Sequence, residues 1–257
     1  MELQYFCEPE TSSEVFAHWR AERLRWWKWL LRNNGETHLR LVDHPKEALA
    51  HYSSACTDIE FLYPWGWGEL EGVAHRGDFD LRAHGKALDV NMAAQRREGT
   101  DRTVPHTIEP AAGLNRGVLA VLLDAYSEET KTSPSSSAEE LRILLRLHPR
   151  LAPIKAGVFP LRASDEKATA LAHDLAQRLR DLDYPSRVDL SGSIGKRYAR
   201  QDELGTPFCI TVDPQTSEDS KVTLRHRDST QQERVHVDDV VPLIHSYISS
   251  EDQHSIL

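Results

Sequence analysis

A chain of 257 residues with 39% hydrophobic residues and six tryptophans can build one large or two modest packed domains, which excludes global disorder. Its formal net charge of −9 argues against non-specific polyanion binding, although a local basic cluster could still contact RNA. The sequence has no apolar run of about 18 residues and no signal-like start, so a soluble, cytoplasmic protein that avoids membranes is predicted.

The three cysteines are Cys7, Cys56 and Cys209. They lie far apart in the sequence and form no CxxC pair, which suits a reducing compartment. We therefore expect reduced, buried thiols, and the sequence predicts no zinc or other metal site.

The first elements follow the apolar pattern at the start of the chain. A strand is predicted over residues 1–7, and because it starts at the first residue, we expect its sheet partners to lie in sequence that is absent. A helix over about residues 12–32 begins at Thr11-Ser12-Ser13-Glu14 and ends at Asn33-Asn34-Gly35. Its large apolar side chains at helical spacing are expected in the core: Phe16, Trp19, Trp26, Trp27 and Leu30.

The next stretch of the chain reads mainly as strands. Alternation predicts strands over residues 39–42, 57–63, 69–74 and 104–109. Residues 45–56 are predicted to be helical. Residues 85–103 are polar without a clear period, and we interpret them as a mobile insertion.

A change of composition marks a domain boundary at residues 127–139. Ser133-Pro134-Ser135-Ser136-Ser137 has the composition of a hydrated connector. A strand over residues 141–147 is assigned to the end of the first domain, and Pro149 and Pro153 mark the entry to the second. The predicted divisions are residues 1–126, 127–150 (connector and last strand), 151–250 and a tail, 251–257.

The second domain alternates strands and helices. Strands are predicted over residues 156–161, 186–190, 208–212, 221–226 and 232–237, and helices over 165–182, 194–203 and 240–249. The first of these helices carries an apolar face of Leu171, Leu175, Leu179 and Leu182. This order predicts a small three-layer α/β domain with a mixed sheet.

Residues 108–116 contain the most informative local pattern, a strand followed by a glycine and a helix. Gly113 permits a turn or a close approach to a ligand. Arg116 would lie at a helix start, which already favours an anion, and Glu109 would point into the same space. An arginine for a nucleotide and a carboxylate for an ammonium make an amino-acid-plus-nucleotide pocket. The alternative is a surface Arg and Glu at a helix edge.

Four stretches carry a resemblance to one family. Glu-Pro-Ala-Ala-Gly-Leu-Asn-Arg at residues 109–116 resembles motif 3 of class II aminoacyl-tRNA synthetases, in the form found in glycyl-tRNA synthetase. Residues 67–81 resemble that family's segment between motifs 2 and 3. Residues 147–155 and 192–200 resemble its anticodon-binding domain. The resemblance covers nearly the whole chain in the same order.

The resemblance implies an α/β fold, with an antiparallel catalytic sheet and an anticodon-binding domain, and it implies two sets of substrate residues. Those for glycine are Glu2, Glu109, Pro110 and Ala111; those for ATP are Glu69, Leu70, Gly113, Leu114, Asn115 and Arg116. Glu71 and Asp78 could serve a Mg²⁺ ion or the tRNA end. The family commonly has Ser where this chain has Ala111, which removes a hydrogen bond of about 1 kcal/mol.

The implied partner is tRNA-Gly, held by basic side chains of the second domain. The candidates are Lys196, Arg197, Arg200, Arg225 and Arg227, with Arg234 on a neighbouring strand, while Asp228 and Gln231 could read bases. The alternative is that these arginines form surface ion pairs.

The implied activity is that of a glycine–tRNA ligase, which uses ATP together with Mg²⁺ to join glycine to tRNA-Gly. The chain contains no motif 1 and no Phe-Arg-x-Glu segment of motif 2. Without the motif 2 arginines, phosphate charge would lose its main stabilisation, so we expect no adenylate formation by this chain alone. It would act with a separately encoded N-terminal half or a homodimer partner. The alternative is a non-catalytic, synthetase-like accessory protein that binds tRNA or another nucleic acid.

Overall fold

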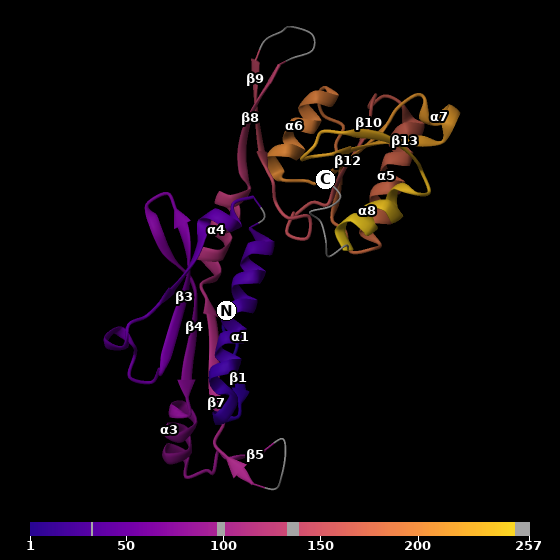
Figure 1. The fold of residues 1–257 in the computed structure, drawn as a ribbon. Coiled ribbons are helices and arrows are strands. Elements are labelled where there is room, and N and C mark those ends of the chain that lie inside the picture. Colours follow the sequence, from indigo (N-terminus) through magenta and orange to yellow (C-terminus); the bar gives the residue numbers. More distant parts are fainter. Residues whose placement is uncertain (32, 97–100, 133–138, 250–257) are drawn as a thin grey trace. The chain divides into compact units, whose positions relative to one another are not determined.

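The computed structural model describes residues 1–31, 33–96, 101–132 and 139–249 (Figure 1). The chain divides into two compact units, Met1–Asp124 and Ala125–Leu257. Each contains helices and a five-stranded sheet, which confirms the α/β class. None of the described helices is long and apolar enough to cross a membrane.

The first unit is built on an antiparallel sheet. Its strands are β1 (Tyr5–Cys7), β2 (Leu39–Asp43), β3 (Ala55–Tyr63), β4 (Gly66–Gly77) and β7 (His106–Ala112), in the spatial order β1-β7-β4-β3-β2. The predicted strand at the start of the chain is confirmed as β1. The expectation that its sheet partners lie in absent sequence is wrong for β7, because β1 pairs with β7 and Glu2 forms a further bridge with Ala111. The antiparallel sheet that the family resemblance implies is also present.

Helix α1 (Ser12–Leu30) packs on one face of β4 and β7 (Figure 1). Its Trp27 is 1% exposed and lies in a core with Ile59 and Phe61 of β3. Trp26, also expected in the core, is instead 36% exposed and stacks beneath the Arg23 guanidinium at 4.5 Å. A helix buries only one stripe, and Trp26 and Trp27 are adjacent residues that cannot both face the sheet.

The remaining elements of this unit are short. They are η1 (Pro9–Thr11), α2 (Gly35–His38), η2 (Lys46–Ala48), α3 (Phe79–Leu88), β5 (Ala94–Gln95), β6 (Arg102–Thr103) and α4 (Leu114–Ala125), which follows β7.

Two longer segments of this unit also differ from the predictions. The helix predicted over residues 45–56 is wrong: only the 3-10 turn η2 forms, and Ala55 already pairs with His75 of β4. Cross-strand pairing thus overrides local helix propensity there. Helix α3 was not predicted, because Gly85 and its polar neighbours weaken the periodic signal. A Cβ at Gly85 would lie 2.8 Å from the Val90 carbonyl oxygen, so the glycine allows the chain to fold back closely. Residues 97–100 of the predicted insertion lie outside the described residues.

The segment predicted as a connector contains a strand. β8 (Tyr126–Thr132) pairs antiparallel with β9 (Glu139–Leu145), and both belong to the second unit. The strand predicted over residues 141–147 therefore exists, with β8 as its partner. The serine-rich residues 133–138 lie outside the described part of the chain.

The second unit has a mixed sheet between helices, as predicted. Its strands are β10 (Ala156–Pro160), β11 (Ser186–Val188), β12 (Phe208–Val212), β13 (Lys221–His226) and β14 (Gln232–His236), in the order β11-β10-β12-β13-β14. The pairs β10–β11 and β10–β12 are parallel, and the other two are antiparallel.

Three of the helices beside this sheet were predicted, and Figure 1 shows them around it. α5 (Glu166–Arg180) and α8 (Val240–Ser249) share the hydrophobic core with one face. α6 (Ile194–Leu204) lies against the other face, where Phe159 meets Tyr198 edge to face. A short helix, α7 (Thr216–Asp219), was not predicted. Leu175 and Leu179 of α5 are fully buried, whereas Leu182, assigned to the same apolar face, is 46% exposed beyond the end of the helix.

Candidate functional site

The two faces of the first sheet differ in burial. Along β3, Thr57, Ile59, Phe61 and Tyr63 are buried, and the residues between them are half-buried. The buried set faces α1, because side chains alternate between the faces of a strand. The opposite face, which we call the open face, carries the alternate residues.

The strand register places most of the residues predicted to bind the substrate glycine on the open face. Glu2 bridges to Ala111, Ala111 pairs with Gly72, and Gly72 pairs with Asp58, so these residues form one row across four strands. In the neighbouring row, Glu109 pairs with Ala74, which pairs with Cys56. Paired residues project to the same side. Carboxylates therefore flank a floor made of small side chains.

Glu109 is 8% exposed and is held from two sides. Its Oε1 accepts a hydrogen bond from Arg76 Nη1 at 2.9 Å, and its Oε2 accepts one from Gln4 Nε2 at 3.0 Å. Arg76 also binds both carboxylate oxygens of Asp80 and stacks over Tyr52 at 4.2 Å. The hydrogen bonds that Arg76 donates to Asp80 contribute most to raising the pKa of Arg76 above its ordinary value, so the arginine remains charged. Glu109 is thus fixed and partly neutralised.

The predicted nucleotide residues lie farther along β4 and on α4. Arg116 donates to the Glu69 backbone oxygen at 2.6 Å, and its guanidinium is 4.0 Å from the Glu69 carboxylate. Glu69 pairs with Glu60, which places it on the open face. Arg116 and Glu109 therefore both lie at the open face, but each side chain contacts different residues. The side chains of Arg116 and Glu69 are 57% and 56% exposed, and exposed ion pairs of this kind add little stability.

The end of β7 continues directly into α4. Gly113, Leu114 and Asn115 are exposed there, and Leu114 is 59% exposed. A Cβ on Gly113 would meet only the Arg116 side chain, at 3.7 Å, which is an ordinary contact. The protein itself therefore does not require a glycine at this position. Gly113 leaves the space beside its backbone open, and its carbonyl accepts a hydrogen bond from the Gly117 amide at 2.9 Å at the start of α4.

Three predicted residues point away from the open face. Leu70, at a register shift in β4, is 1% exposed and lies in the core, so only its backbone remains for ATP. Pro110 is buried and pairs with Val73, so its ring faces α1. Glu71 is 2% exposed and accepts hydrogen bonds from Trp27 Nε1 and Arg23 Nε at 2.5 and 2.7 Å. The proposed role of Glu71 at a metal or tRNA end is therefore wrong.

The carboxylates of Asp58 and Glu69 fit a hard cation on the open face. A Cβ on Gly72 would lie 3.5 Å from Asp58 Oδ1 and 3.7 Å from Glu69 Oε1, so both carboxylates border the same small space. Oxygen ligands of this type suit Mg²⁺ that accompanies a nucleotide. Asp78, the other candidate, accepts a hydrogen bond from Arg82 Nε at 2.5 Å just before α3.

In the second unit, α6 separates the predicted tRNA residues by helix geometry. Lys196 is exposed and Arg200 is half-buried, and residues four apart share a helix face. Arg197 is 3% exposed and donates to the carbonyl oxygens of Pro160, Leu190 and Gly192. Arg200 donates to Asp189 at 2.7 and 3.0 Å. Arg197 is thus a structural residue in this conformation, and the outer face of α6 presents Lys196 and Arg200.

Arg225 and Arg227 are also interior residues. Arg225 is 6% exposed and forms a bidentate pair with Asp202 at 2.9 and 3.0 Å. Arg227 is 1% exposed and donates to Asp228 and to the carbonyl oxygens of Gly205 and Leu147. The N–H groups of both arginines are directed into the protein. In this conformation they are therefore not positioned to contact a phosphate. The sequence left open that these two arginines form surface ion pairs. Both do form ion pairs, but the pairs are buried.

Sequence reasoning missed several residues that shape the open face. Gln4 and Arg76 fix Glu109, and Asp58 borders Gly72. A signal for Gln4 was available, since it lies two positions after Glu2 on a strand and must share its face. Arg76 offered no such signal, because a register shift near His75 sets its direction.

A separate cleft of about 740 Å³ lies in the first unit. Tyr5, Cys7, Val15, Arg96 and Pro105 are among its lining residues. Tyr5 pairs with Ile108, which is fully buried on the α1 side of the sheet. The cleft therefore opens on the side away from Glu109, and we do not assign the substrates to it.

Comparison with known proteins supports the family resemblance of the sequence motifs. Residues 155–247 match the family model described as anticodon binding domain. This range includes α5, α6, most of α8 and the five-stranded sheet of the second unit. The chain is 44% identical over 243 residues to a glycine–tRNA ligase of Thermobifida fusca, covering 93% of this chain and 52% of the relative. A glycine–tRNA ligase of Clostridium tetani is 42% identical over 245 residues, covering 95% and 50%.

The second unit thus contains an anticodon-binding domain. Over nearly its whole length, the chain corresponds to the C-terminal part of a glycyl-tRNA synthetase, as its sequence motifs indicated. The chain spans about half the length of the curated relatives that it matches.

Proposed function

We propose that the chain supplies the tRNA-binding domain and part of the active site of a glycine–tRNA ligase. The reaction would join glycine to ATP, releasing pyrophosphate, and then transfer the glycyl group to the terminal ribose of tRNA-Gly, releasing AMP. The observation that carries the proposal is the identity of about 44% with glycine–tRNA ligases along nearly the whole chain. The row of Glu2, Ala111 and Gly72 on the open face is consistent with it.

In this proposal the glycine ammonium lies between Glu2 and Glu109. A partly dehydrated ammonium needs carboxylates, since an unpaired charge is costly away from water. Arg76 and Gln4 would hold Glu109 in one rotamer, so that it does not have to be ordered when glycine binds. Ala111, beside Glu2, leaves room for the substrate but offers no hydroxyl. Pro110 would contribute indirectly, since its carbonyl accepts from the Leu3 amide at 3.0 Å and so holds the segment that carries Glu2.

The nucleotide would lie along the exposed stretch from Gly113 to Arg116. Arg116 is already ordered by the Glu69 backbone and could stack on a base or pair with a phosphate. Gly113 would allow close approach, while Leu114 and Asn115 are accessible beside it. Leu70 would offer only its backbone, and the carboxylates of Glu69 and Asp58 would hold Mg²⁺ that arrives with ATP.

The second unit would bind tRNA-Gly through the outer face of α6. We expect Lys196→Glu to weaken tRNA-Gly binding about tenfold at low salt and to reduce the slope of log K against log salt by about 1, because one phosphate contact is lost. Fluorescence anisotropy with labelled tRNA-Gly over a salt series measures both quantities.

The matched control is Lys167→Glu, an exposed lysine on α5 with the same change of net charge. It should leave affinity and slope unchanged if binding is local to α6. Equal weakening by both variants would indicate a non-specific charge effect and would remove Lys196 from the interface. Arg200→Glu should weaken binding as well, although it also removes the Asp189 ion pair.

The 257-residue polypeptide by itself should give no detectable glycine-dependent ATP–pyrophosphate exchange. The proposed nucleotide residues include a single arginine, Arg116, and stabilising the charge that develops on phosphate usually takes several fixed cations. Adding the N-terminal half of the Thermobifida fusca enzyme should produce exchange, provided that the two halves assemble. Robust exchange by the polypeptide alone would refute the expected inactivity.

A second candidate is a synthetase-like protein that binds tRNA or another nucleic acid without catalysis. The ion pair between Arg76 and Glu109 favours it, because a neutralised carboxylate attracts an ammonium less strongly. This candidate predicts tRNA binding that depends on Lys196, with no exchange even after the N-terminal half is added. Only the first candidate function requires a separately encoded N-terminal half or a homodimer partner.

A further inference from the structure

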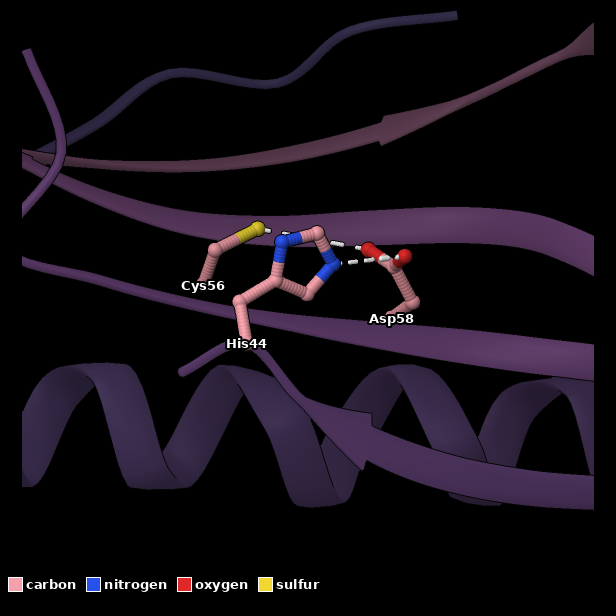
Figure 2. Close-up of side chains that lie close together, drawn as sticks. All are labelled: His44, Cys56 and Asp58. Atoms are coloured by element: carbon pink, nitrogen blue, oxygen red, sulfur yellow. Dashed lines mark hydrogen bonds and ion pairs between the residues drawn. The ribbon is translucent and has the colours of Figure 1, made fainter. Parts of the chain in front are cut away.

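One cluster of side chains is not used by the proposed function beyond a single carboxylate. His44, Cys56 and Asp58 each offer a different donor, namely nitrogen, sulfur and oxygen, and these atoms all lie within 4.8 Å of one another. Figure 2 shows the three side chains directed towards each other. His44 Nε2 is 2.8 Å from Asp58 Oδ2, and Cys56 Sγ is 4.0 Å from Asp58 Oδ1.

The backbone explains why these residues meet. Cys56 and Asp58 are two apart on β3 and so share its open face. The His44 amide donates to the Cys56 carbonyl at 2.9 Å, which extends the β2–β3 ladder by one residue and places His44 opposite Cys56. A residue, its neighbour two positions on and a cross-strand partner form a triangle on one side of a sheet. The donors are therefore held by strands rather than by a loop.

From this geometry we propose that His44, Cys56 and Asp58 form a binding site for a divalent transition metal ion of the zinc type. Tetrahedral zinc takes thiolate at about 2.3 Å and imidazole or carboxylate at about 2.0–2.2 Å, so its ligand atoms lie roughly 3.2–3.7 Å apart. The cluster reaches such spacings by side-chain adjustments of about 1 Å. Three protein ligands leave a fourth position for water, as in open zinc sites.

The donor set distinguishes this ion from Mg²⁺. A thiol and an imidazole select zinc and its neighbours, whereas Mg²⁺ prefers oxygen. The side chains of His44 and Asp58 are 32% and 16% exposed, so an ion can enter from solvent and yet lose much of its hydration. Binding replaces the thiol proton by the metal, and that proton passes to the solvent. The sequence predicted no metal site because it contains no CxxC pair. A site with a single cysteine has no CxxC pair and therefore leaves no such pattern in the sequence.

The test is a titration of the EDTA-treated full chain with Co²⁺, followed by absorption. We expect one ion per chain, with visible d–d bands and a near-ultraviolet thiolate-to-cobalt charge-transfer band that Zn²⁺ displaces. Cys56→Ser should abolish the charge-transfer band and weaken Zn²⁺ binding by more than about tenfold in calorimetry, and His44→Gln should weaken binding similarly. The readout is independent of tRNA and ATP, so its failure would leave the proposed function standing.

The control is Cys7→Ser, which removes another half-buried thiol of the same unit and should leave the spectrum unchanged. Tryptophan fluorescence checks that each variant is folded, because all six tryptophans precede residue 68 and so report on this unit. Absence of a charge-transfer band in the unaltered chain would overturn the proposal. A band that survives Cys56→Ser, or one that disappears with Cys7→Ser, would overturn it equally.

Discussion

Asp202→Asn is expected to destabilise the second unit by about 3–5 kcal/mol, because it leaves the buried Arg225 guanidinium without its counter-ion and removes one of the two carboxylates that bind Arg142. Asp202 is 3% exposed and binds Arg225 at 2.9 and 3.0 Å and Arg142 Nε at 2.8 Å. Burial alone lowers the pKa of Arg225, but the hydrogen bonds that Arg225 donates to Asp202 and the negative charge of that carboxylate more than offset burial, so the pKa lies above its ordinary value. The asparagine retains the shape but not the charge.

Urea denaturation followed by far-UV circular dichroism measures this effect. A loss of about 4 kcal/mol lowers the midpoint for this unit by on the order of 2 M. The tryptophan fluorescence transition, which reports on the first unit, should not move. The control is Glu203→Gln, an exposed neighbour on α6, which should stay within about 0.5 kcal/mol of the unaltered chain. An unchanged dichroism midpoint for Asp202→Asn would show that the buried pairs contribute nothing net.

The second large effect is expected from Glu71→Gln in the first unit. Glu71 accepts from Trp27 Nε1 and from two nitrogens of Arg23, and its side chain is 2% exposed. The amide keeps one acceptor oxygen but sets an N–H₂ against existing donors and removes the charge that pairs with Arg23. Because Arg23 is 24% exposed and can be partly hydrated, we expect a loss of about 2–3 kcal/mol.

Trp27 itself reports this change. The fluorescence-detected urea midpoint should fall, and the emission of the folded state should shift because the indole N–H loses a charged acceptor. Glu69→Gln is the matched control, since Glu69 lies on the same strand but is exposed on the other face. It should leave the midpoint nearly unchanged. An equal fall of the urea midpoint in both variants would contradict the prediction, because the buried and the exposed glutamate would then contribute equally to stability.

These glutamates show how far the sequence could predict the site. The motif resemblance located Glu69 and Glu71 in the same segment, but only the register shift of β4 reveals that they face opposite sides. Strand alternation did predict the strand over residues 57–63, which forms part of β3. Local pattern is therefore sufficient for strands, and long-range register decides which carboxylates meet a ligand.

The arginines of the second unit show the same limit. The predicted helix over residues 194–203 is confirmed as α6, and helical spacing alone separates Arg197 from Lys196 and Arg200. Which of these faces is buried depends on β10 and on the loop before α6, whose carbonyl oxygens accept from Arg197. Sequence composition could not predict this, because an arginine that binds carbonyl oxygens and one that binds phosphate look identical in a sequence.

The strand β1 lies at the end of its sheet in the described part of the chain and pairs only with β7. Tyr5 and Phe6 are 43% and 52% exposed there. A strand with one free side can recruit another molecule by backbone pairing, and this tendency limits solubility at high concentration. The strand is only three residues long and is flanked by the acidic Glu2 and Glu8, and both properties oppose such stacking. Glu2 and Glu8 thus oppose edge-to-edge pairing between copies of this polypeptide.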